Sequence, residues 1–336
     1  MAEWPLVELT AAAMVVSMAA YVLFGGADFG GGVWDLFARG PRAARQRALI
    51  ADTIGPIWEA NHVWLILVVV ILFTGFPIAY ARLSTALHIP LTLMLIGIVL
   101  RGSAFTFRAY DSRADDVQQR WSRLFAISSL VTPVLLGIAA GTVVAGGAAP
   151  PGRLSFHAAY IAPWTAPLPI LVGLMTLTIF AFLAAVYLTV EAREADLATD
   201  FRRRAIASGI ALTLLALATL WVARTAAPRL WEGLLLRPET RLIHVATALS
   251  SLGAFGALLG RRYRTARTFA ALMAALIIVG WALVQYPYLV PPDLTVHEAA
   301  APPITLALLV GALGVGGVIL FPALWYLYRV FGPREG

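Results

Sequence analysis

The chemistry-bearing residues of this chain gather in the stretch "IGPIWEANHVWLILVVVILFTGFPIAYA", residues 54 to 81. It has the composition of a membrane-spanning helix, yet Glu59, Asn61 and His62 lie close to where its apolar run begins. A carboxylate at the centre of a spanning helix costs about 2.5–3.5 kcal/mol on insertion scales, and such groups usually pair with one another or mark a pathway. The stretch therefore predicts a polar site inside a membrane.

Two further charged residues are expected at the same depth. Asp28 follows the first apolar run, and Arg101 ends the third. Because successive spanning helices run in opposite directions, the end of the first, the start of the second and the end of the third lie on one side of the membrane. If these helices pack together, Asp28, Glu59 and Arg101 converge.

This convergence has two interpretations. Glu59 and Arg101 could form an ion pair that fixes helix packing, since intramembrane charges commonly pair. Alternatively, Glu59 is a protonatable group on a route that leads inward from the cytoplasm. The residue types allow both.

The chain offers little for a cofactor. It has no cysteine, which excludes thiolate metal sites and iron–sulfur clusters. Transmembrane b-type haem takes paired axial ligands, and the histidines have no spacing that suggests a pair, so we expect no metal or haem on this chain. We expect His62 to be a hydrogen-bonded packing residue, and Trp58 and Trp64 to pack beside the polar residues. The five histidines are His62, His88, His157, His244 and His297.

Glycines surround Asp28 in "GGADFGGG" and permit tight turns or close approach of helices. They superficially resemble a phosphate-binding loop. No strand precedes them and no Lys–Ser/Thr pair follows, which argues against a nucleotide site.

Composition identifies an all-α polytopic membrane protein. Of its 336 residues, 60% are hydrophobic and 13% are charged, against about 25% charged in ordinary globular domains. A spanning helix needs about 20 apolar residues. Since no basic segment precedes the first run, we expect it to be a retained helix and not a cleaved signal. Nine candidate spans lie at about 6–25, 53–78, 80–101, 124–146, 164–190, 205–223, 243–260, 267–286 and 302–328.

The basic residues define an orientation. All 25 are arginines, and nine spans place nineteen of them on one side and six on the other. Cytoplasmic loops carry the excess of positive charge, so we expect the N-terminus outside and the C-terminus in the cytoplasm. Topology thus explains the net charge of +7, and no nucleic acid is required. The six outer arginines are Arg82, Arg153, Arg224, Arg229, Arg237 and Arg241.

No soluble domain is evident, so residues 1–336 form a single membrane domain. "YVLFGGADFGGG" in the first run and "YLTVEAREADLATD" in the fifth each lead from a tyrosine into acidic residues. This internal similarity suggests one four-helix bundle at 1–146, a second at 160–286 and a ninth helix at 302–329.

The motifs, taken in order, resemble subunit II of the cytochrome bd-type terminal oxidases over essentially the whole chain. The resemblance implies two four-helix bundles plus one helix in a bacterial inner membrane. It also implies a partner, subunit I, that carries haem b, haem d and the quinol site, with small accessory subunits and membrane lipid as further partners. The complex would oxidise quinol and reduce O2 to water with cytoplasmic protons, along a path that subunit II helps to line. The motifs are "GGADFGGGVWDL", "GPIWEANHVWL", "ILFTGFPIAYA", "LRGSAFTFR", "QYPYLVPPDLTVHEAAAPPITL" and "YRVFGPREG".

The resemblance also assigns site residues, with Asp28 and Glu59 in the proton path. Glu59 stands where the family commonly has Asp. Gly25 and Thr106 stand where many members have an acid, so two carboxylates of the usual path are absent. The supporting polar residues are Trp58, Asn61, His62, Trp64, Arg101, Thr106 and Arg108.

Two other functions remain open. A stand-alone proton-coupled transporter would also use buried charges and repeated helical units, although helices five to eight contain few buried charges. A pure assembly scaffold is the third candidate. The outer segment "QYPYLVPPDLTVHEAA" would either dock a partner or cap the bundle.

Overall fold

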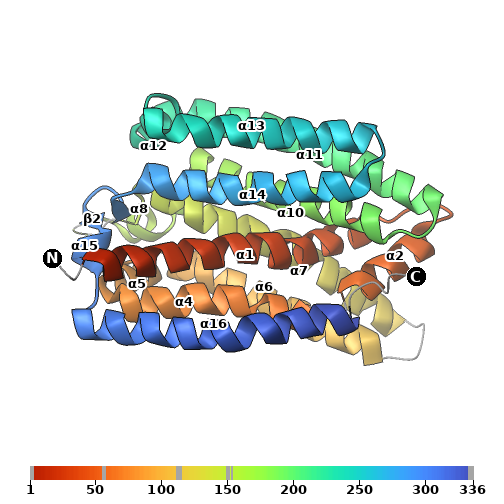
Figure 1. Cartoon of the computed structure of the whole chain (residues 1–336), viewed down its shortest axis with the longest axis horizontal. Coiled ribbons are helices and arrows are strands. Elements are labelled where there is room, and N and C mark those ends of the chain that lie inside the picture. The colour runs from red at the N-terminus through yellow and green to blue at the C-terminus, as the bar shows by residue number, and fades with distance from the viewer. Residues whose placement is uncertain (1–3, 55–57, 111–115, 149–151, 153, 332–336) are drawn as a thin grey trace.

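Long helices that run side by side build the whole molecule (Figure 1). The computed structural model describes residues 4–331 except 55–57, 111–115, 149–151 and 153. Eight helices of the described part are long and apolar enough to cross a membrane, and a bent pair supplies a ninth span if it is counted as one. This confirms an all-α polytopic protein. The eight are α1 (Trp4–Leu36), α6 (His88–Tyr110), α7 (Asp116–Val144), α10 (Pro167–Glu191), α11 (Ala195–Ala226), α13 (Pro238–Leu259), α14 (Tyr263–Gln285) and α16 (Pro303–Phe331).

The bent pair differs from the expected second and third spans. Helix α4 (Val63–Gly75) ends before Phe76, and α5 (Pro77–Ala86) leaves at 117°. Phe76 has non-helical angles, and Pro77 cannot donate the backbone hydrogen bond that would continue α4. The third span is therefore α6, which begins at His88 and not at residue 80.

Helix α1 is longer than the expected 6–25, because the glycine-rich segment does not break it. The helix continues to Leu36, so Asp28 lies inside a helix and not in a turn. A side chain at Gly30 would collide with the carbonyl oxygen of Phe180, and one at Gly26 would meet the Phe180 ring at 2.6 Å. The close approach of α1 and α10 thus offsets the low helix propensity of glycine.

Helix α1 also joins the two expected bundles. It packs against α4 and α7 from the first, and against α10 and α14 from the second. One buried cluster contains Tyr21 and Phe29 of α1 with Phe180 and Phe182 of α10. The division into two four-helix units therefore stays a prediction.

The two ends of the bundle carry different short elements (Figure 1). At the end here called the α2 end lies helix α2 (Ala43–Ile54), followed along the chain by α3 (Trp58–Asn61). The opposite end, the α15 end, holds strands β1 (Tyr288–Val290) and β2 (Leu294–Thr295), which pair antiparallel, and α15 (Val296–Ala299). The other short helices are α8 (Phe156–Tyr160), α9 (Ala162–Thr165) and α12 (Pro228–Leu235).

The segment between α14 and α16 packs on its own chain. Val290 is fully buried, the Ala301 amide donates to the Gly75 carbonyl at 2.8 Å, and Arg82 pairs with Asp293 at 2.8 Å. These contacts favour capping of the bundle over docking of a partner.

Candidate functional site

A buried polar cluster lies where α1, α3 and α6 meet. Asp28, Asn61 and Arg101 are 3%, 1% and 1% exposed. The Asn61 side-chain amide donates a 2.6 Å hydrogen bond to Asp28 Oδ2. Arg101 lies close enough to Asp28 for their charges to interact. Residues far apart in sequence thus share one depth in the bundle.

Arg101 is held by one hydroxyl and two aromatic rings. Its Nε donates to Ser129 Oγ at 3.1 Å, and its guanidinium lies 4.5 Å from the Phe29 ring centroid and 5.1 Å from that of Phe125. Among the described residues, Nη2 finds no hydrogen-bond acceptor. Aromatic faces attract a cation within about 6 Å of their centroid, so this arrangement keeps the charge beside Asp28 without a direct partner for every N–H group.

His62 and Trp64, at the start of α4, have different surroundings. His62 precedes the helix, and its ring lies 6.3 Å from that of Tyr21 and 6.0 Å from that of Phe29. Trp64 is 6% exposed and packs against Phe24. Trp64 therefore packs against an aromatic ring of α1, while His62 borders the polar cluster.

The other expected site residues are placed only in part. Glu59 and Trp58 lie in α3 and Arg108 in α6, but their side chains are outside the described part of the structure. The Glu59–Arg101 pair is therefore not placed, and both interpretations of Glu59 stay open. Thr106 is exposed, and its hydroxyl donates to the Gly102 carbonyl of its own helix at 3.0 Å.

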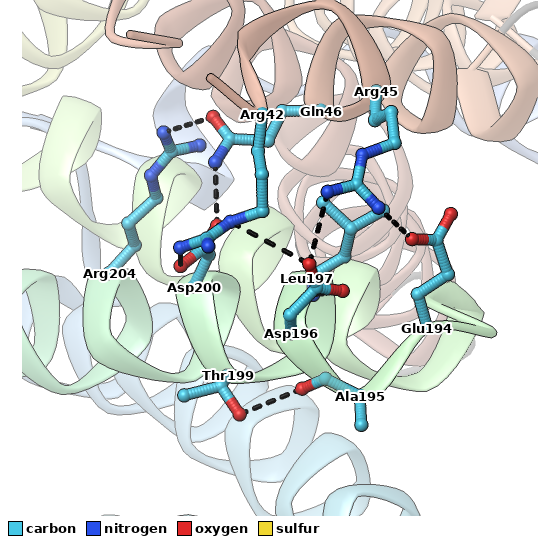
Figure 2. Close-up of polar contacts among 10 residues, drawn as sticks. All are labelled: Arg42, Arg45, Gln46, Glu194, Ala195, Asp196, Leu197, Thr199, Asp200 and Arg204. Atoms are coloured by element: carbon cyan, nitrogen blue, oxygen red, sulfur yellow. Dashed lines mark hydrogen bonds and ion pairs between the residues drawn. The ribbon is translucent and has the colours of Figure 1, made fainter. Parts of the chain in front are cut away.

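A second polar network, at the α2 end, was not anticipated from sequence (Figure 2). Arg42 makes two 2.7 Å hydrogen bonds to the Asp200 carboxylate, and Gln46 adds a third at 2.8 Å. Arg204 donates to Gln46 at 2.7 Å. The acidic run "EAREAD" and the arginines after α1 were the available signal, but their pairing across about 150 residues depends on the tertiary fold.

The neighbouring pairs extend this network. Arg45 contacts both Glu194 and Asp196 (Figure 2), the latter at 3.1 Å. The bidentate pair of Arg42 with Asp200 beside them adds geometric specificity. The network therefore fixes α2 against α11, just beyond the end of the helix that carries Asp28.

The chemistry available to the buried cluster is proton transfer. A carboxyl, an imidazole, a phenol and a serine hydroxyl can each gain or lose a proton or carry one through a hydrogen bond. The described residues contain no group of three or more metal-ligating side chains. Intramembrane carboxylates commonly mark proton relays.

Comparison with known proteins places this chain in a family. Residues 6–331 match the family model described as cytochrome bd terminal oxidase subunit II. The chain is thus a polytopic membrane protein by its fold and a terminal oxidase subunit by its family match. It belongs to the cytochrome bd terminal oxidase subunit II family.

Individual relatives of the chain carry the names of bd oxidase subunits. The chain is 36% identical over 121 residues to cytochrome bd ubiquinol oxidase subunit 2 of Bacillus subtilis (strain 168), covering 36% of this chain and 35% of that protein. A second protein of that strain, provisionally named cytochrome bd menaquinol oxidase subunit II, is 24% identical over 322 residues, which cover 93% and 91% of the two chains. The first alignment thus spans about a third of that relative's length.

Solved structures show the same fold. A chain of the bd oxidase from Geobacillus thermodenitrificans superposes with a TM-score of 0.81 at 21% identity, over 98% of this chain and all of that one. The helical architecture is therefore that of a bd oxidase chain.

Proposed function

We propose that this chain is the haem-free subunit II of a bd-type terminal oxidase. In that complex, quinol oxidation is coupled to reduction of O2 to water, and the b- and d-type haems and the quinol site belong to subunit I. The observation that carries the proposal is the family match over residues 6–331 together with the buried Asp28–Asn61–Arg101 cluster.

Within this complex the cluster delivers protons. Reduction of O2 to water consumes one proton for each electron, so the haem site needs a supply. Asp28, held by Asn61 and near Arg101, is a buried carboxyl that can take up and release a proton. Glu59, two residues before Asn61, is the second carboxyl of the route.

The orientation follows from charge. Arg42 and Arg45 lie at the α2 end, where they pair with Asp200 and Asp196, and Arg39 and Arg47 lie beside them in the sequence. The arginine-rich side of a membrane protein faces the cytoplasm, so protons enter at the α2 end and the N-terminus faces outward.

Helix α16 offers a contact face for subunit I. It is the least buried of the candidate spans in the described part, with 11% of its most apolar window buried. Side chains built at Gly311, Gly314 or Gly316 would meet no neighbouring atom within 4 Å. Small residues allow close packing of helices in membranes, which suits a second multi-helix subunit.

Purification tests the proposal. The tagged chain, solubilised in mild detergent from its native membrane, should co-purify with a second multi-helix subunit and show haem bands in the reduced-minus-oxidised spectrum. A colourless protein that purifies alone would support a stand-alone transporter instead. If both the Asp28→Asn and the Glu59→Gln complexes reduced O2 at the normal rate, this chain would serve only as an assembly scaffold.

A further inference from the structure

Three ionisable residues form a line along α1. Tyr21, Asp28 and Asp35 are spaced seven residues apart, and each is 3% exposed. Seven residues make almost two turns, so the three side chains share one face at steps of about 10 Å along the axis. Asp35 lies at the α2 end, and Tyr21 lies near the middle of the helix.

Gly25 shapes the part of this line between Tyr21 and Asp28. A Cβ at Gly25 would lie 2.7 Å from Cε2 of Tyr21. The phenol ring therefore lies along α1, over Gly25, and runs toward Asp28. Its hydroxyl lies close enough to Arg101 and Asp28 to feel their charges, and the ring occupies the space beside Gly25, where the family resemblance leads one to expect a carboxyl.

Gly32 shapes the part between Asp28 and Asp35. A Cβ there would collide with Ser129 Oγ, so the absence of a side chain lets this hydroxyl lie against α1 between the two carboxyls. The same oxygen accepts the 3.1 Å hydrogen bond from Arg101 Nε. Ser129 is fully buried, and it connects the part of the line between Asp35 and Asp28 to the Asp28 cluster.

We propose that Tyr21 and Asp35 are proton-carrying members of the route that contains Asp28. Asp35 takes up a proton at the α2 end, Asp28 receives it by way of water and the Ser129 hydroxyl, and the Tyr21 phenol passes a proton onward to the middle of the membrane. At each step one O–H bond breaks and one forms, and no electron moves. Tyr21 thereby takes over from the carboxyl absent at Gly25. This inference rests on the proposed function.

The test uses the complete complex with its haem subunit. Tyr21→Phe keeps the ring over Gly25 and removes only the hydroxyl, and Asp35→Asn removes only the protonatable oxygen. Tyr187→Phe is the matched control, because Tyr187 occupies the corresponding place in "YLTVEAREAD" and packs under Arg267, its charged neighbour. Asp52→Asn in the exposed part of α2 is the second control.

We expect Tyr21→Phe and Asp35→Asn to reduce O2 several-fold more slowly at unchanged haem content, while both controls match the wild type. Wild-type rates in these two variants with a slow Asp28→Asn would overturn this inference and leave the proposed function standing. Wild-type rates in Asp28→Asn and Glu59→Gln as well would remove both.

Asp35→Asn could fail to assemble, and then Asp35→Glu and Asp35→Ser carry the test. The glutamate variant keeps a carboxyl and should turn over faster than the serine variant. Equal rates in the two would overturn the role of Asp35, and Tyr21→Phe decides the role of Tyr21 independently.

Discussion

The side-chain amide of Asn61 donates a 2.6 Å hydrogen bond to the carboxylate of Asp28, and this bond joins α3 to α1 inside the bundle. It gives one buried acid a fixed partner and a fixed orientation. The account of proton delivery depends on that acid.

The Asn61→Ala variant should weaken the complex, because it removes the hydrogen bond to Asp28. A hydrogen bond to a charged group contributes about 1.5–3 kcal/mol, and its loss leaves a buried carboxylate short of a donor. We expect slower O2 reduction and a lower unfolding temperature. Thr178→Ala is the control, because the Thr178 hydroxyl donates to the Leu174 carbonyl of its own helix at 2.7 Å; equal losses in both variants would show a general effect.

The role of Arg101 should depend on the shape and hydrogen bonding of its guanidinium group as well as on its positive charge. Arg101→Lys keeps the positive charge but cannot lie flat against Phe29 and Phe125 while also donating to Ser129. Turnover should fall in the order wild type, Arg101→Lys, Arg101→Gln. Steady-state O2 consumption per haem measures this order, and a fully active glutamine variant would contradict it.

The packing of α1 on α10 predicts a strong effect at Gly30. An added methyl group collides with the Phe180 carbonyl, and overpacking of this kind costs about 1–3 kcal/mol. Gly30→Ala should lower the unfolding temperature or prevent assembly. Gly256→Ala meets nothing within 4 Å and should behave as wild type in the same thermal assay.

The segment around α15 should loosen in acid. Thr295 donates through its backbone and hydroxyl to Glu298, and these hydrogen bonds hold the pKa of Glu298 below its usual value. A lowered carboxyl pKa stabilises the fold above the ordinary value, and this contribution disappears as the pH falls through the lowered pKa. The protection factors of the amides in residues 295–299, that is, their exchange rates corrected for the intrinsic slowing of exchange at low pH, should therefore fall in acid in the wild type.

Glu298→Gln is the comparison for that experiment. It should exchange faster at neutral pH and show a weaker dependence on acid. An identical pH profile in the two proteins would mean that another group controls the segment.

Much of the fold of this molecule could be predicted from its sequence. Apolar runs identified most of the spans but not the break at Phe76, and alternation of helix direction brought Asp28 and Arg101 to one level. The sequence left open whether the glycine segment forms a tight turn or a close helix contact, and it is the contact with Phe180 that keeps α1 helical there.

Two features of the polar regions could be found only from the three-dimensional structure. The Tyr21 ring lies over Gly25 because of a side-chain orientation that no spacing rule gives. The Arg42–Asp200 pair joins residues 158 apart, and nothing local in either segment selects the other as its partner.

The most direct test of the central claim is O2 reduction by the purified Asp28→Asn complex, measured beside its haem spectrum. With haem content unchanged, the account predicts turnover slower by about tenfold or more, as for loss of a proton-transfer group. Wild-type turnover in that variant would contradict proton delivery through this subunit.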